Sequence, residues 1–285
     1  MSGIAALINP NSGSVPADAE AQLSELMAEL GKDCDITVLG ESDFVETIDA
    51  CIESEPDMII VWSGDGTIAC TFERVGSDGP PILPLPGGTM NLFHKQIHGG
   101  PCTWDECLRR ALDGGRIIDV PAGCAGDRRF YVAAMVGALT DLAGPREAVR
   151  EGKFLQAIEK LAGSDILDLR TNMTFKLTNE QNKVIDGFAT ATAMFVGEAG
   201  DDTLEYAYID PDNPLELAAS GIGALFSDWR DASGVQTLRA REVTIEEEKG
   251  YELRVTLDGE PVRLKSGTKF GRISKAGKAI SAQIE

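Results

Sequence analysis

Two glycine-rich turns, each directly after a short apolar segment, constrain the fold of this chain most strongly. The apolar segments are Met58–Val61 and Ile82–Leu85, and the turns after them span residues 64–67 and 87–91. Short apolar runs that end in glycines are typical of buried strands, and each turn here leads into a stretch with helical spacing. The pattern therefore predicts two successive strand–turn–helix units.

The same alternation extends through the first 122 residues. Further strands are expected at Ile4–Ile8, Ile36–Leu39 and Arg116–Val120. Helices are expected between them, one after an N-cap at Ser42 and one from a capping box at Thr103 to about Gly114. Strands that alternate with helices of this length predict an α/β domain with a parallel sheet and helices on both faces. Ligands of such sheets bind beyond the carboxyl ends of the strands, where both glycine turns lie.

The pattern changes near residue 122. One helical stretch is expected at about residues 142–162, and the other regular segments have the composition of strands. These expected strands are residues 129–136, 168–177, 184–196, 205–209, 241–246 and 251–257. The second half therefore predicts a mainly antiparallel, β-rich domain at residues 123–285, after an α/β domain at residues 1–122.

The charge of the chain restricts its partners. It has 46 acidic and 26 basic residues and a net charge of −20, which argues against nucleic-acid binding and against anionic membrane surfaces. The sequence shows neither a long apolar run nor a secretory signal, so we expect a cytoplasmic location. The six cysteines lack CxxC spacing and there are two histidines, so we expect reduced thiols and no structural zinc site.

The first glycine turn combines phosphate-binding features with an acid. Gly64 and Gly66 allow the backbone to approach a phosphate closely, and Thr67 either contacts the phosphate or caps the next helix. The carboxylate of Asp65 suits this place if it binds a divalent metal or accepts a proton from a nucleophile. A tight turn without a ligand is the alternative. The second turn at the same sheet edge favours a site for a phosphorylated nucleotide, near helix N-termini.

Other polar segments are open to two interpretations. The loop Asn9–Gly13 either contacts nucleotide or is an ordinary turn. Asp119, at a strand end, is a general base, part of a metal network, or a solvated residue. Lys95 either reaches a phosphate or lies on a helix surface. The segment Asp258–Glu260 predicts a hairpin turn, because Asp-Gly is a strong turn signal.

Taken together, these segments resemble the diacylglycerol kinase catalytic domain family, which includes bacterial soluble lipid kinases, sphingosine kinases and ceramide kinases. The matching residues, spread over most of the chain, are Asn9-Pro10-Asn11-Ser12-Gly13, Gly64-Asp65-Gly66-Thr67, Pro86 with Gly88-Thr89-Met90-Asn91, Asp119, and Asp258-Gly259-Glu260. The G-D-G-T element is shared with NAD kinases and phosphofructokinases. The P-x-G-T-x-N element and the late D-G-E separate the lipid kinases from those relatives.

The resemblance implies an ATP- and Mg²⁺-dependent lipid kinase, with a nucleotide-binding domain at residues 1–122, a lipid-substrate domain at residues 123–285, and an active site in the cleft between them. Asp119 is the implied base, and Asp65 and Glu260 are the implied ligands of Mg²⁺. The residues implied to bind ATP are Asn9, Asn11, Ser12, Gly13, Gly64, Gly66, Thr67, Gly88, Thr89, Asn91 and Lys95.

The expected acceptor is a hydroxyl of diacylglycerol or of a related lipid such as a ceramide or a sphingoid base. The stretch Leu215–Trp229 is either a wall of the lipid site, a segment for transient membrane contact, or an amphipathic core helix. The sequence carries no signal for oligomeric state.

Four positions depart from the family pattern. Ser63 replaces a usual Gly, Cys70 a frequent Glu, Leu92 a frequent Asp, and Lys95 a frequent Arg. Cys70 and Leu92 support one alternative function, a catalytically weakened regulator that binds nucleotide or lipid. A second alternative is an NAD-kinase-like enzyme that phosphorylates a soluble substrate.

Overall fold

The computed structural model describes residues 3–137, 140, 173–197, 201–209, 235–247, 250 and 252–283. The chain divides into two units, one formed by Met1–Pro121 with Ser274–Glu285 and the other by Ala122–Ile273. The domain boundaries predicted from the sequence place residues 274–285 in the β-rich domain. The contacts of these residues place them in the first unit instead. The assignment of nucleotide and lipid to separate domains stays a prediction.

The first unit is built on a parallel sheet, as the sequence predicts. Its strands are β1 (Ile4–Ile8), β2 (Cys34–Val38), β3 (Met58–Ser63) and β4 (Ile82–Pro86), in the order β2-β1-β3-β4. The end of strand β15 (Thr268–Ser281) adds beside β4, also parallel, through the pair Ala279 and Ile82. The carboxyl ends of β1, β3 and β4 thus meet at one edge.

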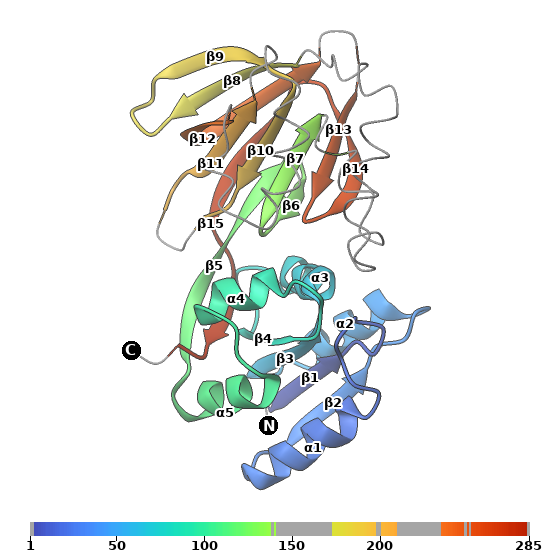
Figure 1. The fold of residues 1–285 in the computed structure, drawn as a ribbon. Coiled ribbons are helices and arrows are strands. Elements are labelled where there is room, and N and C mark those ends of the chain that lie inside the picture. The colour runs from blue at the N-terminus through green and yellow to red at the C-terminus, as the bar shows by residue number, and fades with distance from the viewer. Residues whose placement is uncertain are drawn as a thin grey trace. The chain divides into compact units, whose positions relative to one another are not determined.

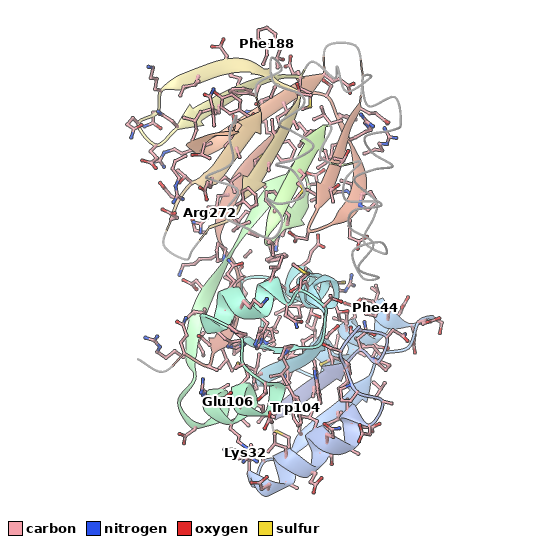
Figure 2. All side chains as sticks on the ribbon, viewed as in Figure 1. Lys32, Phe44, Trp104, Glu106, Phe188 and Arg272 are labelled. Carbon is pink, nitrogen blue, oxygen red and sulfur yellow. The ribbon has the colours of Figure 1, made fainter. Side chains whose placement is uncertain are left out.

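Helices cover both faces of this sheet (Figure 1). Helices α1 (Ala19–Glu29) and α5 (Trp104–Gly114) share a core with alternate strand residues such as Ile60 and Leu83. In that core the rings of Trp62 and Trp104 stack at 4.3 Å, and Figure 2 labels Trp104 at the start of α5. Because successive strand residues point to opposite faces, Leu7, Ile59 and Val61, which are fully buried, serve the other face.

The second face carries α2 (Phe44–Glu53), α3 (Asp65–Val75) and α4 (Leu92–His98). Helix α3 contacts β3, α4 contacts β4, and α2 contacts α3. The rings of Phe72 and Phe93, 5.0 Å apart, join α3 to α4. The buried aromatic pair therefore fixes the two helices that leave the glycine turns relative to each other.

The helix ends test the capping predictions. The Thr103 side chain accepts a hydrogen bond from the Glu106 backbone N–H at 3.4 Å, so the predicted N-cap of α5 is confirmed. Helix α2 has Asp43 as its N-cap and not Ser42, and the Asp43 side chain makes no capping hydrogen bond. The expected Ser42 cap is therefore wrong by one residue.

The second unit is a mainly antiparallel β structure, as predicted. Its neighbouring strands follow the order β14-β13-β7-β10-β11-β12, and β8 pairs with β12 and β9. These strands are β7 (Ala133–Gly137), β8 (Met173–Asn179), β9 (Val184–Ala189), β10 (Ala191–Phe195), β11 (Leu204–Ile209), β12 (Val235–Glu247), β13 (Glu252–Leu257) and β14 (Glu260–Lys265). One apolar cluster, which includes Phe175, Tyr206, Val243 and Phe270, forms the core of this unit.

Several boundaries differ from the expected ones. The strand expected at residues 129–136 is divided into β6 (Arg128–Phe130) and β7, and the one at residues 184–196 into β9 and β10. Strand β5 (Arg116–Ala125) is longer than expected. Strands β14 and β15 were not expected, because charged residues interrupt their apolar pattern.

Three expected features lie wholly or partly outside the described residues. These are the helix at residues 142–162, the stretch Leu215–Trp229 and residues 168–172 of one strand. Among the residues that the structure does describe, no helix has the length and apolar character needed to cross a membrane.

Candidate functional site

The loop after β1 and the two glycine turns meet at the carboxyl edge of the first unit's sheet. The Oγ atoms of Ser12 and Ser63 lie 2.9 Å apart, and the Gly64 N–H donates to Ser12 Oγ at 3.1 Å. The Ser14 N–H donates to the Gly87 carbonyl oxygen at 2.9 Å. The structure therefore brings the predicted segments 9–13, 64–67 and 87–91 together. It also gives Ser63, a departure from the family pattern, a hydrogen-bonding function.

Side chains of the first loop hold its own shape and contact the G-D-G-T turn. Asn9 accepts the Asn11 N–H through its Oδ1 at 3.0 Å and donates from its Nδ2 to Thr67 Oγ1 at 2.9 Å. The Asn11 amide donates to Glu41 at 3.4 Å on the exposed surface. The polar groups of Asn9 and Thr67 thus serve mainly to join the loop to the start of α3.

The two glycine turns pack backbone against backbone. A Cβ on Gly88 would lie 2.8 Å from the Gly64 Cα, and a Cβ on Gly64 would lie 3.3 Å from the Gly88 Cα. The Gly88 N–H donates to Asn91 Oδ1 at 2.7 Å, so both glycines use their N–H groups within the chain. Gly64 and Gly88 therefore serve the close approach of the two turns, and their expected contact with ATP stays a prediction.

Gly66 has a different environment from the other two glycines. It lies exposed in the first turn of the eleven-residue helix α3, and nothing is within 4 Å of the place its Cβ would occupy. The first N–H groups of a helix lack intrahelical partners and attract anions. The open approach to this helix end is therefore the place in the site best suited to a phosphate.

Asn91 closes the second turn. Its backbone is left-handed, with φ of 49°, and its side-chain amide donates to the Gly88 carbonyl oxygen at 2.9 Å while its Oδ1 accepts the Gly88 N–H. Asn tolerates this conformation better than most residues. The asparagine of the P-x-G-T-x-N element thus has a local structural role that the sequence did not reveal.

Asp65 connects the two turns. Its carboxylate accepts the Leu92 N–H at 3.1 Å and the Phe93 N–H at 2.9 Å, which are the first two amides of α4. A carboxylate has about four lone-pair positions, so two hydrogen bonds leave it able to bind a cation. The side chain of Leu92 is 40% exposed, and its aliphatic side chain offers no oxygen where the family often has Asp.

The remaining nucleotide-site candidates lie around this edge. Thr89 is exposed, and its Oγ1 would be 3.2 Å from a Cβ on Gly13. Lys95 is exposed on α4. Cys70, on α3, is half-buried, and burial raises the pKa of its thiol. A neutral thiol supplies no charge where the family often has Glu.

Asp119 forms an ion pair with Lys275, a residue that no motif in the sequence indicates. The Lys275 ammonium lies 2.7 Å from Asp119 Oδ2, and the two side chains are 70% and 45% exposed. Lys275 belongs to β15 and Asp119 to β5, so their proximity depends on the return of the chain to the first unit. The basic residues Lys269, Arg272, Lys275 and Lys278 recur at every third position, so the sequence carries no period-two signal for this strand.

Asp258 and Glu260 lie in the second unit. Asp258 and Gly259 both have positive φ, at 47° and 87°, and connect β13 to β14, so the predicted hairpin turn is confirmed. The Asp258 carboxylate accepts the N–H groups of Tyr131, Val132 and Ala133 at 2.6–2.9 Å. These bonds explain the division between β6 and β7. Glu260 is exposed at the start of β14, and its role as a metal ligand stays a prediction.

Solved structures of other proteins share this fold. The chain aligns over 98% of its length with two crystal structures from Bacillus anthracis str. Sterne. One is a candidate diacylglycerol kinase, with a TM-score of 0.74, 19% identity and 97% of that chain covered. The other is a diacylglycerol kinase, with a TM-score of 0.69, 18% identity and 97% of that chain covered. At this identity the likeness shows a common fold.

The sequence itself matches the family of the diacylglycerol kinase catalytic domain over residues 3–120. This segment contains the first loop, both glycine turns and Asp119. Over this segment the chain is similar to the diacylglycerol kinase catalytic domain family.

Proposed function

We propose that this protein is an ATP- and Mg²⁺-dependent kinase that phosphorylates a hydroxyl of diacylglycerol or of a related lipid. The observation that carries the proposal is the packing of the Gly64 and Gly88 turns beside the open helix end at Gly66. This arrangement offers a phosphate a helix N-terminus without side-chain obstruction. The family match over residues 3–120 supports the same class of reaction.

The residues around the turns suit the phosphates of ATP. The N-terminus of α3 has a positive electrostatic potential, and an exposed Lys95 on α4 adds a cation. In a chain with a net charge of −20, such local groups have to outweigh the general repulsion of anions. Asn9, Asn11, Ser12 and Gly13 would form the other wall of the nucleotide site.

The acidic residues suit Mg²⁺, which prefers oxygen ligands. We assign Asp65 as one ligand, because two amide contacts leave its carboxylate with lone pairs to share. Glu260 is the second assigned ligand. When bound, the metal would neutralise charge on the transferred phosphoryl group. Asp65 also fixes the start of α4, so it would couple metal binding to the shape of the second turn.

We assign Asp119 as the group that orients and deprotonates the acceptor hydroxyl. Its side chain is 45% exposed, so a substrate has access to it, and its ion pair with Lys275 holds it in place. Ile117 stands two residues before Asp119 on the same face of β5 and is 64% exposed. An exposed apolar side chain beside the base suits an acceptor with an apolar body and therefore favours a lipid over NAD.

The test is ATP turnover with a panel of diacylglycerol, ceramide, a sphingoid base and NAD. We expect a lipid to be the best acceptor and Asp119→Asn to lower kcat by about 10²–10⁴-fold, the usual contribution of acid–base catalysis. Asp113→Ala, an exposed residue near the end of α5, is the matched control and should leave kcat unchanged. Turnover by Asp119→Asn at the wild-type rate would overturn the assignment, and NAD outcompeting every lipid would replace the substrate class.

Leu92 favours one other function, a binding protein with weakened catalysis. Its exposed aliphatic side chain stands at the start of α4, next to the amide contacts of Asp65. This hypothesis predicts binding of ATP without phosphoryl transfer at saturating Mg²⁺. If Leu92→Asp then gains activity, the missing acid limits catalysis in the wild-type chain.

A further inference from the structure

One face of the β13–β14 hairpin is basic in a chain that is strongly acidic. Alternate residues of the hairpin pack into the core of the second unit, so the residues between them point to the opposite face. That face carries Glu252, Arg254 and Thr256 on β13, and Pro261, Arg263 and Lys265 on β14. Three of these side chains are basic and one is acidic, although acids outnumber bases by 46 to 26 in the whole chain. The charge of this face is therefore opposite to that of the chain.

Two arginines stand directly opposite each other on this face. The strand register pairs Arg254 with Arg263, and Glu252 with Lys265. The Cβ atoms of directly opposite residues are about 4.5–5.5 Å apart, and like charges in this position destabilise a sheet. The one acid of the face stands opposite the lysine, so the arginine pair keeps an excess of positive charge.

The basic residues are open to solvent at the end of the sheet. Arg263 and Lys265 are exposed, and Arg254 is half-buried. Among the described strands β14 pairs with β13, and Figure 1 shows it on the far side of β13 from β7. Several arginines elsewhere pair with acids, such as Arg109 with Glu29. Within the part of the chain that the structure describes, the side chains of Arg263 and Lys265 have no ion pair, so they are available to an external anion.

The kind of anion follows from the proposed substrate. A kinase of diacylglycerol has to reach a hydroxyl at the surface of a membrane, so this step rests on the function proposed above. The net charge of −20 repels a membrane that contains anionic phospholipids. Each Lys or Arg close to such a membrane strengthens binding by about fivefold. The chain can therefore approach anionic headgroups when its basic face is turned towards them.

We propose that Arg254, Arg263 and Lys265 form a surface by which this chain binds the anionic headgroups of a phospholipid membrane. Arginine suits this partner, because its guanidinium binds phosphate through two parallel hydrogen bonds. The same strand carries Glu260 three residues before Arg263, about 10 Å away at the rise of an antiparallel strand. Membrane binding here would hold the lipid surface close to a residue that we assign to Mg²⁺. The net charge, which argues against anionic membranes, describes the whole chain and not this face.

The test is co-sedimentation of the full chain with phospholipid vesicles, without ATP or Mg²⁺, so that binding is measured apart from catalysis. Vesicles of phosphatidylcholine are compared with vesicles of equal parts phosphatidylcholine and phosphatidylglycerol. We expect binding to the anionic vesicles alone, and weaker binding as the salt concentration rises, because salt screens surface charges. Equal binding to both kinds of vesicle, or to neither, would overturn the proposal. The charges of β14 would then protect an edge strand against pairing with another chain.

Two double variants of equal charge test the location of the surface. Arg263→Gln with Lys265→Gln should weaken binding to the anionic vesicles by about 25-fold, at about fivefold per residue. Lys176→Gln with Lys183→Gln removes two exposed lysines at the β8–β9 hairpin of the same unit. This second pair is the matched control and should bind as the wild type does. If both double variants lose the same affinity, the effect comes from net charge and the proposed surface is wrong.

Turnover separates this proposal from the proposed function. With a short-chain diacylglycerol dissolved as monomers, Arg263→Gln with Lys265→Gln should have the kcat of the wild type, because no membrane is involved. With diacylglycerol in anionic vesicles, the same variant should need more lipid to reach its half-maximal rate. If the wild type phosphorylates neither substrate but binds anionic vesicles, the kinase assignment is wrong and the membrane surface is supported. If the variant loses kcat on the dissolved substrate, these residues act in catalysis and the membrane-binding role is wrong.

Discussion

Replacement of Gly88 by Ala tests whether the two glycine turns depend on backbone contact. The new Cβ would stand 2.8 Å from the Gly64 Cα and 3.2 Å from Asn91 Oδ1, whereas ordinary contacts begin near 3.4 Å. The nearest atom is backbone, so the turns must move apart by about half an ångström. Overpacking of this kind costs about 1–3 kcal/mol.

The matched control is Gly66→Ala. No atom lies within 4 Å of its Cβ, and its position in the first turn of α3 favours Ala over Gly by up to about 1 kcal/mol. We therefore expect Gly66→Ala to be as stable as the wild type or slightly more stable. If the open helix end binds phosphate, the same variant weakens ATP binding, because its methyl group lies on the approach.

Urea unfolding, followed by tryptophan fluorescence, measures the stability of both variants. Trp62 and Trp104, which stack in the core of the first unit, report on its unfolding. A lower midpoint at an unchanged denaturant slope indicates a loss of stability and not a change of the unfolded state. The reasoning would be refuted if Gly88→Ala unfolded at the wild-type midpoint and bound ATP with wild-type affinity.

Two further predictions concern stability. Asp258→Ala should destabilise the second unit by about 3 kcal/mol, because three N–H groups lose a charged acceptor. Asp258→Asn should lose less stability, because the amide oxygen can still accept. If both variants have the Tm of the wild type, Asp258 does not have this role. Burial lowers the pKa of His98 from 6.5 to about 4. Between pH 6.5 and about 4 the unfolded chain therefore binds more protons than the folded chain, so the free energy of unfolding falls as the pH falls. Between these pH values the wild-type chain should lose about 3 kcal/mol of its free energy of unfolding because of His98, at about 1.4 kcal/mol per pH unit. The loss should be smaller in His98→Gln. If the urea midpoints of the wild type and of His98→Gln depend on pH in the same way, the prediction is refuted.

Local patterns in the sequence were sufficient to predict the strands β1 to β4 of the first unit, but not β15. Alternating apolar runs located β1, β3 and β4, and the capping box located the start of α5 at Thr103. These signals are local because strand burial and helix capping depend on residues a few positions apart. The convergence of the first loop with both turns followed from the rule that parallel strands end at one edge.

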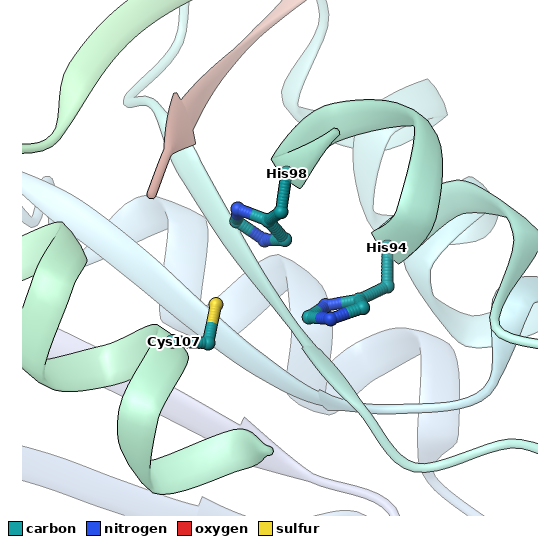
Figure 3. Close-up of side chains that lie close together, drawn as sticks. All are labelled: His94, His98 and Cys107. Carbon is teal, nitrogen blue, oxygen red and sulfur yellow. The ribbon is translucent and has the colours of Figure 1, made fainter. Parts of the chain in front are cut away.

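The contacts within the site were not predictable in the same way. Asp65 was interpreted as a metal ligand, and its hydrogen bonds to the first amides of α4 depend on the approach of two helices. The partner of Asp119, Lys275, lies on a strand whose charged residues conceal its periodicity. The proximity of His94, His98 and Cys107 (Figure 3) depends on the packing of α4 and α5 against β4, which spacing along the chain does not reveal.

The return of β15 to the first unit has a consequence for the order of events during synthesis. Ala279 pairs with Ile82, and the Ala282 N–H donates to His98, so residues translated after the whole second unit complete the first one. When only residues 1–122 have emerged from the ribosome, the sheet of the first unit therefore has an open edge at β4. We expect the first unit to reach its final stability only after the β-rich unit has been synthesised. Until then, the edge of β4 is exposed to chaperones.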